Sequence, residues 1–298
     1  MVKRKILLDT DIGDDIDDAF ALALALKKAD LETVGVTTVF RNTADRAQQV
    51  KKFLEVAGKS LPVYAGERLP YKEPFHAFEK DGEGAPEKQH ICQWEESYAN
   101  YPVEENGVDF IIENVKKYGK ELTIVPIGPM TNIARAIEKA PDVMKQVGGI
   151  VHMGGWFTNC VPEWNILCDP EAADIVYRSG IDVYAVGLDV TLQCELDDGL
   201  LEDFRKSEKP ENKQLVQWLD RWFAYFNFEK SVMHDPLVVA CIGNDVCSFE
   251  KKYVKVNLTD NRGAIEVSDT ECEGMMPVCV ATAVDKKKFY AIVRNNLL

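Results

Sequence analysis

The sequence predicts an α/β fold: a doubly wound, mostly parallel sheet flanked by helices, with a small additional β pair. Two observations predict it. Strand-like segments alternate with helical patterns along most of the chain, and polar clusters follow several strands, where open α/β sheets bind their ligands. Because 298 residues with 46% hydrophobic content can bury a substantial core and no Ser/Pro/Gly-rich linker divides them, we expect a single domain over 1–298.

The N-terminal part begins with strands and helices in strict alternation. Residues 6–8 are an apolar run typical of a buried strand, and 19–26 form a helical segment that is apolar on every face and is therefore predicted to be buried. The β-branched segment 32–39 is predicted to be a second strand. A helix at 44–57 and a short strand at 62–64 follow it.

A long polar stretch separates this part from the next strands. Residues 66–105 contain Pro, Gly, aromatic and charged residues, which favours a surface excursion near a site. Regular structure resumes with a helix at 108–118, a strand at 122–127, a helix at 129–139 that opens with a proline, and a strand at 147–153 that ends in two glycines.

The C-terminal part continues the alternation and then adds a β pair. A helix at 169–179 has a proline in its first turn, and the β-branched segment 183–190 is predicted to be a strand. The remaining elements are helices at 195–205, at 213–228, from 235 and from about 285, and a β pair at 253–258 and 264–267 around the turn 260–263.

Composition excludes several classes of function. The formal charge of −14 argues against DNA, RNA or an acidic membrane surface as partners, because clustered Lys and Arg hold those polyanions. A small neutral or cationic substrate fits better. The eight cysteines contain no CxxC pair, which favours reduced thiols over a zinc site or a disulfide scaffold. With no signal-type or membrane-spanning apolar segment, we expect a cytoplasmic protein.

An acidic run directly follows the first strand. Six carboxylates lie within ten residues, at Asp9, Asp11, Asp14, Asp15, Asp17 and Asp18. Capping of the next helix needs only one or two of them. Like-charge repulsion would raise the pKa values of so many neighbouring carboxyl groups unless a cation neutralised them. Oxygen ligands of this kind suit Ca²⁺ or Mg²⁺ and not zinc.

Further landmarks lie where later strands end, and together they resemble a known family. The sequence is similar to the Ca²⁺-dependent nucleoside hydrolases, also called inosine-uridine-preferring nucleoside hydrolases, over nearly the whole chain. Five motifs in register carry the resemblance, which makes it specific. They are the DxDxG…DDA run from Asp9 to Ala19, GPxTN at 128–132, MGG at 153–155, E-aromatic-N…DPEAA at 163–173, and HDP at 234–236.

The resemblance implies hydrolysis of the N-glycosidic bond of ribonucleosides to free base and ribose, in nucleoside salvage, by an N-glycosidase that uses Ca²⁺. It also implies a homodimer or homotetramer. The common family spelling is DxDxGxDDA, and this chain carries two extra residues. Anchoring on the pair before the alanine gives the family roles to Asp17 and Asp18, and leaves Asp14 and Asp15 as turn or capping residues; the opposite assignment remains open.

Residue roles follow from the resemblance. Asp11 is expected to be a metal ligand and the general base for a calcium-held water, with Asp18, Asp235 and the carbonyl of Ile127 as the other ligands. Asp9 is either a ligand or, as we favour, a brace behind the ligands. The substrate-binding residues are expected to be Asp17, Asn42, Asn159, Glu163, Asn165 and, as a pocket wall, Trp164.

Several of these residues also have structural interpretations. Asn42 and Asn165 could be turn or capping residues. His234 precedes the ligand Asp235 and is either the acid that protonates the leaving base or a packed residue at a helix start. His76 lies in the long loop, in a context that departs from the family spelling. The aromatic residues of the 213–228 helix are either core or a lid over the base.

Three alternatives remain open at this stage. The substrate could be a modified nucleoside such as a 7-deazapurine, on the same scaffold. A phosphatase of the haloacid dehalogenase type would share Asp9-Thr10-Asp11 after the first strand, but it places Thr or Val where Gly13 stands. A binding protein without activity would need no base, so the presence of Asp11 speaks against it.

Overall fold

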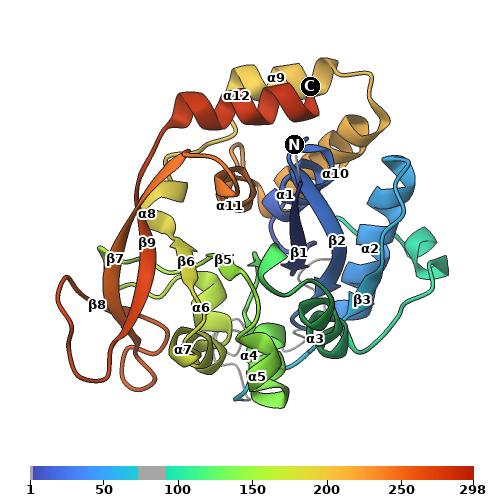
Figure 1. Cartoon of the computed structure of the whole chain (residues 1–298). Coiled ribbons are helices and arrows are strands. Elements are labelled where there is room, and N and C mark those ends of the chain that lie inside the picture. The colour runs from blue at the N-terminus through green and yellow to red at the C-terminus, as the bar shows by residue number, and fades with distance from the viewer. Residues whose placement is uncertain (1–2, 73–91) are drawn as a thin grey trace.

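A computed structural model describes residues 3–72 and 92–298 of the chain. Nine strands form one sheet in the order β3-β2-β1-β4-β5-β6-β9-β7-β8 (Figure 1). The pairs from β3 to β9 are parallel, and β7 is antiparallel to both β9 and β8. The strands are β1 (Arg4–Thr10), β2 (Leu31–Thr38), β3 (Val63–Ala65), β4 (Leu122–Pro126), β5 (Gly149–Met153), β6 (Val183–Val186), β7 (Cys247–Val256), β8 (Ile265–Ser268) and β9 (Met276–Val284).

Helices cover both faces of this sheet. The major ones are α1 (Asp17–Lys27), α2 (Thr43–Val56), α3 (Gly107–Tyr118), α4 (Thr131–Lys139), α7 (Pro170–Arg178), α9 (Asp198–Lys206), α10 (Pro210–Phe226), α11 (His234–Cys241) and α12 (Lys286–Leu297). Short elements are α5 (Pro141–Met144), α6 (Trp164–Cys168), α8 (Leu188–Thr191), and the 3-10 turns η3 (Glu96–Asn100) and η4 (Gly119–Glu121).

The strand order reverses at β1. The chain runs from β1 outward through β2 to β3, and then returns to pair β4 with the other side of β1, from Lys5 opposite Leu122 to Asp9 opposite Pro126. Such a switch point leaves a crevice beyond the carboxyl ends of the two central strands, because the connections leave in opposite directions. The fold therefore places the segments after β1 and β4 side by side.

Alternation along β1 assigns its side chains to two cores. Ile6 and Leu8 pack in the core that contains α1 and α11, whereas Leu7 packs in the core that contains α3 and α4. By the same alternation Asp9 faces α4 and Thr10 faces α1. The helices α1 and α11 lie next to each other (Figure 1), so their N-terminal ends meet at the crevice.

The predicted α/β class with a mostly parallel sheet is confirmed, and several details differ. The strand predicted over 183–190 ends at Val186, because Leu188 begins a short helical turn. Helix α4 begins at Thr131 and not at Pro129. The β pair is not separate: β9, which was not predicted, joins it to β6. The five-residue helix α6 was not predicted either.

Two expectations concern the surroundings of the protein. Among the described residues, no helix combines the length and apolar character that a membrane crossing requires. All eight cysteines lie in the described part of the chain and are free thiols.

Candidate active site

A cavity of about 430 Å³ opens at the carboxyl ends of β1 and β4. Carboxylates line its floor, and apolar and aromatic side chains line its walls. This combination provides ligands for a cation below a surface on which a flat ring can lie. The lining residues are Asp11, Asp14, Asp15, Asp17, Asp18, Ile127, Met153, Glu163, Trp164, Asn165, Leu188, Trp222, Phe226, Phe228, His234 and Asp235.

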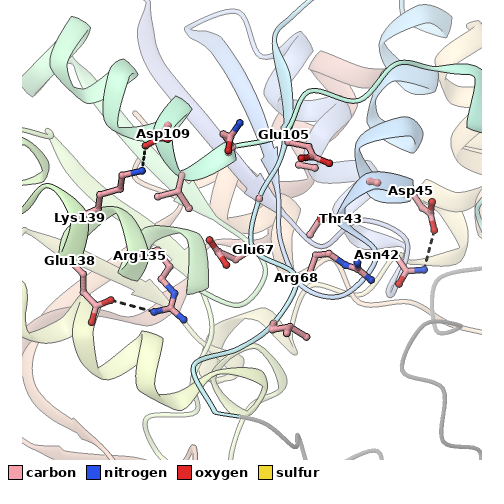
Figure 2. A pocket seen from close by; sticks show the side chains of 17 residues that line it. Asn42, Thr43, Asp45, Glu67, Arg68, Glu105, Asp109, Arg135, Glu138 and Lys139 are labelled. Carbon is pink, nitrogen blue, oxygen red and sulfur yellow. Dashed lines mark hydrogen bonds and ion pairs between the residues drawn. The ribbon is translucent and has the colours of Figure 1, made fainter.

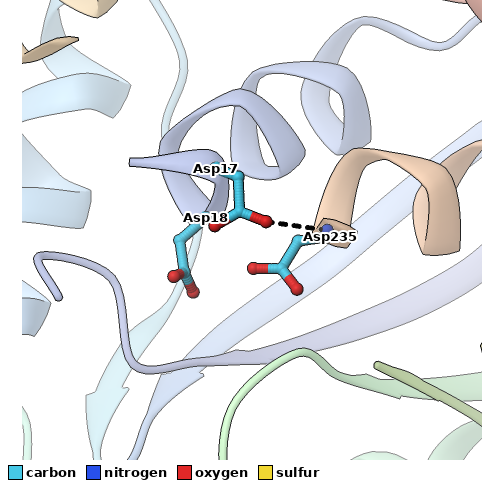
Figure 3. A group of neighbouring side chains, drawn as sticks. All are labelled: Asp17, Asp18 and Asp235. Atoms are coloured by element: carbon cyan, nitrogen blue, oxygen red, sulfur yellow. Dashed lines mark hydrogen bonds between the residues drawn. The ribbon is translucent and has the colours of Figure 1, made fainter. Parts of the chain in front are cut away.

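Three carboxylates on the floor of the cavity can hold a metal ion. Asp17 and Asp18 project from the first turn of α1, and Asp235 projects from the first turn of α11 (Figure 3). One oxygen of each lies within 4.8 Å of the others, and all three side chains are buried. Residues more than two hundred positions apart are thus brought together, because the two helices begin at the same crevice.

Hydrogen bonds hold two of these three carboxylates, those of Asp18 and Asp17, in place. The Thr10 hydroxyl donates a hydrogen bond to Asp18 Oδ1, which is possible because Thr10 faces α1. The backbone N–H of Asp235 donates to Asp17 Oδ2 at 3.0 Å (Figure 3). Asp17 therefore satisfies one of the free N–H groups at the start of α11 and links the two helices.

Burial makes the negative charge of this cluster costly. It raises the pKa of Asp17 to about 6 and that of Asp11 to about 8, from an ordinary value of 3.8. Burial and the neighbouring aspartates also raise the pKa values of Asp18 and Asp235 well above that value. Near neutral pH the floor therefore favours a bound cation, since a cation offsets the repulsion that protons otherwise relieve.

Asp11 lies just beyond β1, outside the three-carboxylate group but in the same cavity. Its side chain packs against Gly128, in the turn after β4: a Cβ on Gly128 would stand 2.8 Å from Asp11 Cγ. The turn thus holds Asp11 through a close backbone approach that only glycine allows.

Asp9 is also buried but does not line the cavity. Its Oδ1 accepts hydrogen bonds from Thr37 Oγ1 at 2.5 Å and from Asn132 Nδ2 at 2.7 Å. Asn132 also donates to the Thr38 carbonyl at 3.1 Å. Asp9 therefore joins β1 to β2 and to α4, the geometry expected of a brace.

The ends of β4 and β5 supply the opposite side of the cavity. Asn165 Nδ2 donates to the carbonyl of Ile127 at 2.9 Å. Glu163 caps α6, since its carboxylate accepts the N–H groups of Asn165 at 2.9 Å, Ile166 at 3.2 Å and Gly155 at 2.9 Å. These bonds hold a carboxylate and an amide at fixed positions facing the floor.

Aromatic side chains form the upper wall. Trp164, Trp222, Phe226 and Phe228 line the cavity, and the rings of Phe226 and Phe228 are stacked at 5.7 Å with 16° between their planes. Phe228 is 51% exposed and Trp164 is 41% exposed. Large apolar rings that stay exposed at the mouth of a pocket are suited to stacking on a planar ligand.

His234 stands between the floor and the wall. Its Nδ1 is 2.7 Å from the hydroxyl oxygen of Thr191. Burial lowers the pKa of His234, although Asp15 and Glu163 oppose that shift. Burial therefore favours the neutral imidazole, with one ring nitrogen held by Thr191 and the other able to exchange a hydrogen bond in the cavity.

Comparison with known proteins identifies the family. The family model for inosine-uridine preferring nucleoside hydrolases matches residues 6–291. The chain belongs to this family. It is a nucleoside hydrolase, an enzyme that cleaves ribonucleosides.

Relatives of this nucleoside hydrolase carry several substrate names. A probable uridine nucleosidase 1 from Oryza sativa is 31% identical, covering 99% of this chain and 97% of its own. The pyrimidine-specific ribonucleoside hydrolase RihA from Shewanella sp. (strain MR-7) is 34% identical over 82% of this chain and 79% of its own. The solved structure of a purine-preferring ribonucleoside hydrolase from Gardnerella vaginalis superposes with a TM-score of 0.84, at 30% identity, covering 98% and 97% of the two chains.

The nucleoside hydrolase cavity gathers most of the residues that the sequence singled out. Its lining contains twelve of them: Asp11, Asp17, Asp18, Ile127, Glu163, Trp164, Asn165, Trp222, Phe226, Phe228, His234 and Asp235. The two extra aspartates, Asp14 and Asp15, also line it; the sequence favoured turn or capping roles for them and left the opposite assignment open. The pair that clusters with Asp235 is Asp17 and Asp18. His76 lies outside the described residues.

Two expected substrate contacts do not line this cavity. Asn159 is exposed, and its Oδ1 accepts the N–H of Val161 at 3.3 Å. Asn42 lines a separate cleft of about 1010 Å³ (Figure 2) and donates to Asp45 Oδ2 at 3.0 Å. The backbone has positive φ at both Phe40 and Arg41, so the chain turns sharply before Asn42 and carries its amide to the start of α2.

Residues to which sequence analysis gave no role in the site include Arg46, Met153 and Leu188. Met153 and Leu188 line the cavity as apolar wall. Arg46 binds the loop that carries Asp11. An arginine within an ordinary helical pattern carries no local signal of such a contact, because the contact depends on how the helix packs.

Replacing Gly128 with alanine is expected to lower kcat of this nucleoside hydrolase by about 10- to 100-fold. A Cβ there would displace the carboxylate of Asp11, the residue that the sequence resemblance implies as general base. Steady-state kinetics with uridine and circular dichroism measure activity and folding. Gly199→Ala is the matched control, since neither Gly128 nor Gly199 has a positive φ. A Cβ at Gly199 would come no closer than 3.3 Å to its nearest neighbour, Asp197 Oδ1. Equal kcat for Gly128→Ala and wild type would contradict the proposed contact.

Proposed function

We propose that this nucleoside hydrolase cleaves ribonucleosides to free base and ribose with Asp11 as general base and Ca²⁺ held by the floor of the cavity. The observation that carries the proposal is the meeting of Asp17, Asp18 and Asp235 within 4.8 Å, at the base of a cavity with an aromatic wall. A pocket built for a metal and a flat ring suits a nucleoside, which has a diol at one end and a base at the other.

The donor set fits Ca²⁺. All the candidate ligands are oxygens, from Asp11, Asp18, Asp235 and the carbonyl of Ile127, and no thiol or imidazole is among them. Asp17, the third member of the carboxylate group, lies beside them, where it can bind the metal or a ribose hydroxyl held next to it. The raised pKa values on the floor support this fit, since buried carboxylates lacking a counter-charge bind protons instead. When bound, Ca²⁺ would orient a water and the ribose hydroxyls and make that water more acidic.

The residues of the chain supply the remaining chemistry. Cleavage passes through a ribosyl cation-like transition state, so it needs a deprotonated water on one face and a stabilised leaving base. Asp11 accepts the proton of the attacking water. Asp17, Glu163 and Asn165 bind the ribose hydroxyls through oxygen and amide groups that the surrounding backbone bonds keep in place. The Trp164 and Trp222 rings stack on the base and exclude water.

His234 is proposed to donate a hydrogen bond to the departing base. Its neutral imidazole, oriented by Thr191, can act on a poor leaving group such as uracil. His234→Gln is expected to lower kcat for uridine by about 100-fold and to change kcat little for p-nitrophenyl riboside, whose leaving group needs no proton. Equal losses on both substrates would contradict this role.

The names of the relatives include uridine, pyrimidine and purine preferences. A wall of stacking rings accepts several bases. The experiment that tests the proposed function is release of ribose from uridine, cytidine, inosine, adenosine and a 7-deazapurine nucleoside. Uridine is expected to be cleaved, and release of ribose from none of these nucleosides would overturn the proposal.

Calcium is expected to stabilise the protein more at high pH than at low pH. The pKa values of Asp17 and Asp11 are raised to about 6 and about 8, so the neutral carboxyls favour the folded state at low pH. That stability is lost as pH rises through these folded-state values. Ca²⁺ replaces the protons, so the rise in Tm caused by Ca²⁺ should be at least about 5 °C larger at about pH 8.5 than at about pH 5.5.

Differential scanning calorimetry in Ca²⁺ and in EGTA at both pH values measures this difference. NaCl at the same ionic strength is the control, because Na⁺ competes only weakly for a site of several carboxylates. A shift in Tm that is independent of pH would contradict binding of Ca²⁺ by these carboxylates.

The assembly and setting of the enzyme are further proposals. We propose a homodimer or homotetramer of single-domain subunits, which sedimentation velocity measures directly. A cytoplasmic role in nucleoside salvage is supported by the eight free cysteines. Subcellular fractionation tests this location.

A further inference from the structure

Arg46 is a fully buried cation on α2 that reaches the loop between β1 and α1. Residues 11–16 form this loop, called the acidic loop below. Arg46 Nη1 donates to the carbonyls of Asp11 and Ile12, the latter at 3.0 Å. Arg46 Nε donates to the Phe40 carbonyl at 2.9 Å. Arg46 Nη2 lies 3.4 Å from Asp14 Oδ2, an ion pair at longer range.

This set of partners suits a guanidinium and no other side chain. Burying a cation costs hydration energy, which is recovered only when hydrogen-bond acceptors and an opposite charge surround it. The planar fork of arginine presents five donors in fixed directions. A lysine at position 46 would keep the charge, but its single ammonium group could not bind the Phe40 carbonyl and the carbonyls of Asp11 and Ile12 at the same time.

The acidic loop is supported at both ends from α2. Near its start, Arg46 binds the carbonyl of Asp11. Near its end, the carbonyl of Asp15 accepts the amide of Gln93 at 2.8 Å, and Gln93 Oε1 accepts from Gln49 Nε2 at 3.1 Å. Gln49 lies about one turn along α2 from Arg46, so one face of this helix sets the path of the loop.

Asp11 lies between two fixed surfaces. Its backbone is tied to Arg46, and its carboxylate packs against Gly128 in the turn after β4. Because β1 ends at Thr10, Asp11 is the first residue of the acidic loop, and its position depends on the order of that loop.

We propose that Arg46 is a positioning residue that orders the acidic loop and holds the Asp11 carboxylate in place before the cation and the substrate bind. The inference rests on the proposed function of Asp11. It assigns to Arg46 no contact with substrate.

Hydrogen exchange of the metal-free protein tests the proposal without any reaction. In Arg46→Gln, amides of the peptide spanning 11–18 are expected to exchange at least about 10-fold faster than in the wild type. Lys28→Gln is the matched control. Lys28 is another buried cation that binds a backbone carbonyl, that of Ile242 at 2.7 Å, and it does so at the far ends of α1 and α11. This variant should leave exchange in 11–18 unchanged.

Calcium titration calorimetry and steady-state kinetics with uridine extend the test. In Arg46→Gln, the affinity for Ca²⁺ and the kcat for uridine are each expected to fall by about 10- to 100-fold. KM for uridine should change less than kcat. Arg46→Lys should recover only part of these losses. Wild-type exchange and Ca²⁺ affinity in Arg46→Gln would overturn the proposal. Full recovery in Arg46→Lys would also overturn it, because charge alone would then suffice.

A folding failure does not prevent the test. Arg46→Gln leaves Asp14 without its ion pair, so the double variant Arg46→Gln/Asp14→Asn, in which both charges are removed, replaces it if the single variant does not fold. Exchange and Ca²⁺ binding are measured without nucleoside. If the wild type released no ribose, the proposed function would fail, whereas the positioning of the loop by Arg46 would still be decided by exchange.

Discussion

Asp11→Asn is expected to lower kcat for ribose release by about 10³-fold, because an amide cannot accept the proton of the attacking water and a general base contributes about 10²- to 10⁴-fold. Asparagine keeps the shape of the side chain and its packing against Gly128. The variant should therefore fold, and the loss should persist at saturating Ca²⁺ and saturating uridine. Steady-state kinetics over a range of Ca²⁺ concentrations measures it.

Asp9→Asn is the matched control for this substitution. Asp9 is equally buried and stands two residues earlier, but it braces Thr37 and Asn132 outside the cavity. Asparagine can still accept both hydrogen bonds, so kcat should fall by less than about 10-fold. Wild-type turnover in Asp11→Asn, or an equal loss in both variants, would remove Asp11 as the base.

Asp235→Asn is expected to weaken Ca²⁺ binding by at least about 100-fold, since the affinity of oxygen sites depends strongly on the number of ligand charges. The N–H that binds Asp17 belongs to the backbone and is retained. In EGTA the variant should have a higher Tm than the wild type, because one of three crowded like charges is removed. In Ca²⁺ its Tm should be lower.

Titration calorimetry with Ca²⁺ measures the change in affinity, and thermal unfolding in EGTA and in Ca²⁺ measures the two opposite changes in Tm. Asp169→Asn serves as the control for loss of a buried carboxylate, since Asp169 accepts from Thr131 Oγ1 at 2.7 Å and caps α7 away from the cavity. Its Tm should fall by the same amount in both conditions. A fall in Tm of Asp235→Asn in EGTA would argue that this carboxylate is structural.

The sequence predicted the parts of the fold that local patterns determine. The apolar strand at 6–8 and the apolar helix at 19–26 lie within β1 and α1. Strand β9 was missed because Pro277 and the polar residues before it favour a loop, whereas its pairing with β6 and β7 is a long-range contact. The five residues of α6 are too few to show a helical period.

The candidate site was predictable where a motif coincides with the end of a strand or the start of a helix. Asp17, Asp18 and Asp235 meet because parallel strands and their helices share one edge of the sheet. Asn42 also follows the end of a strand, β2, yet the backbone turn at Phe40 and Arg41 carries it to another cleft. Packing of α2 decides the role of Arg46, and no local pattern encodes that packing.

The dependence of ribose release on Ca²⁺ tests the central claim most directly. Wild-type protein treated with EGTA and dialysed should release almost no ribose from uridine, and addition of Ca²⁺ should restore the full rate, with half-recovery at the dissociation constant that calorimetry gives. If the metal-free protein released ribose at the rate of the Ca²⁺-loaded protein, the reaction would not require Ca²⁺. The proposed role of the carboxylates on the floor of the cavity would then be contradicted.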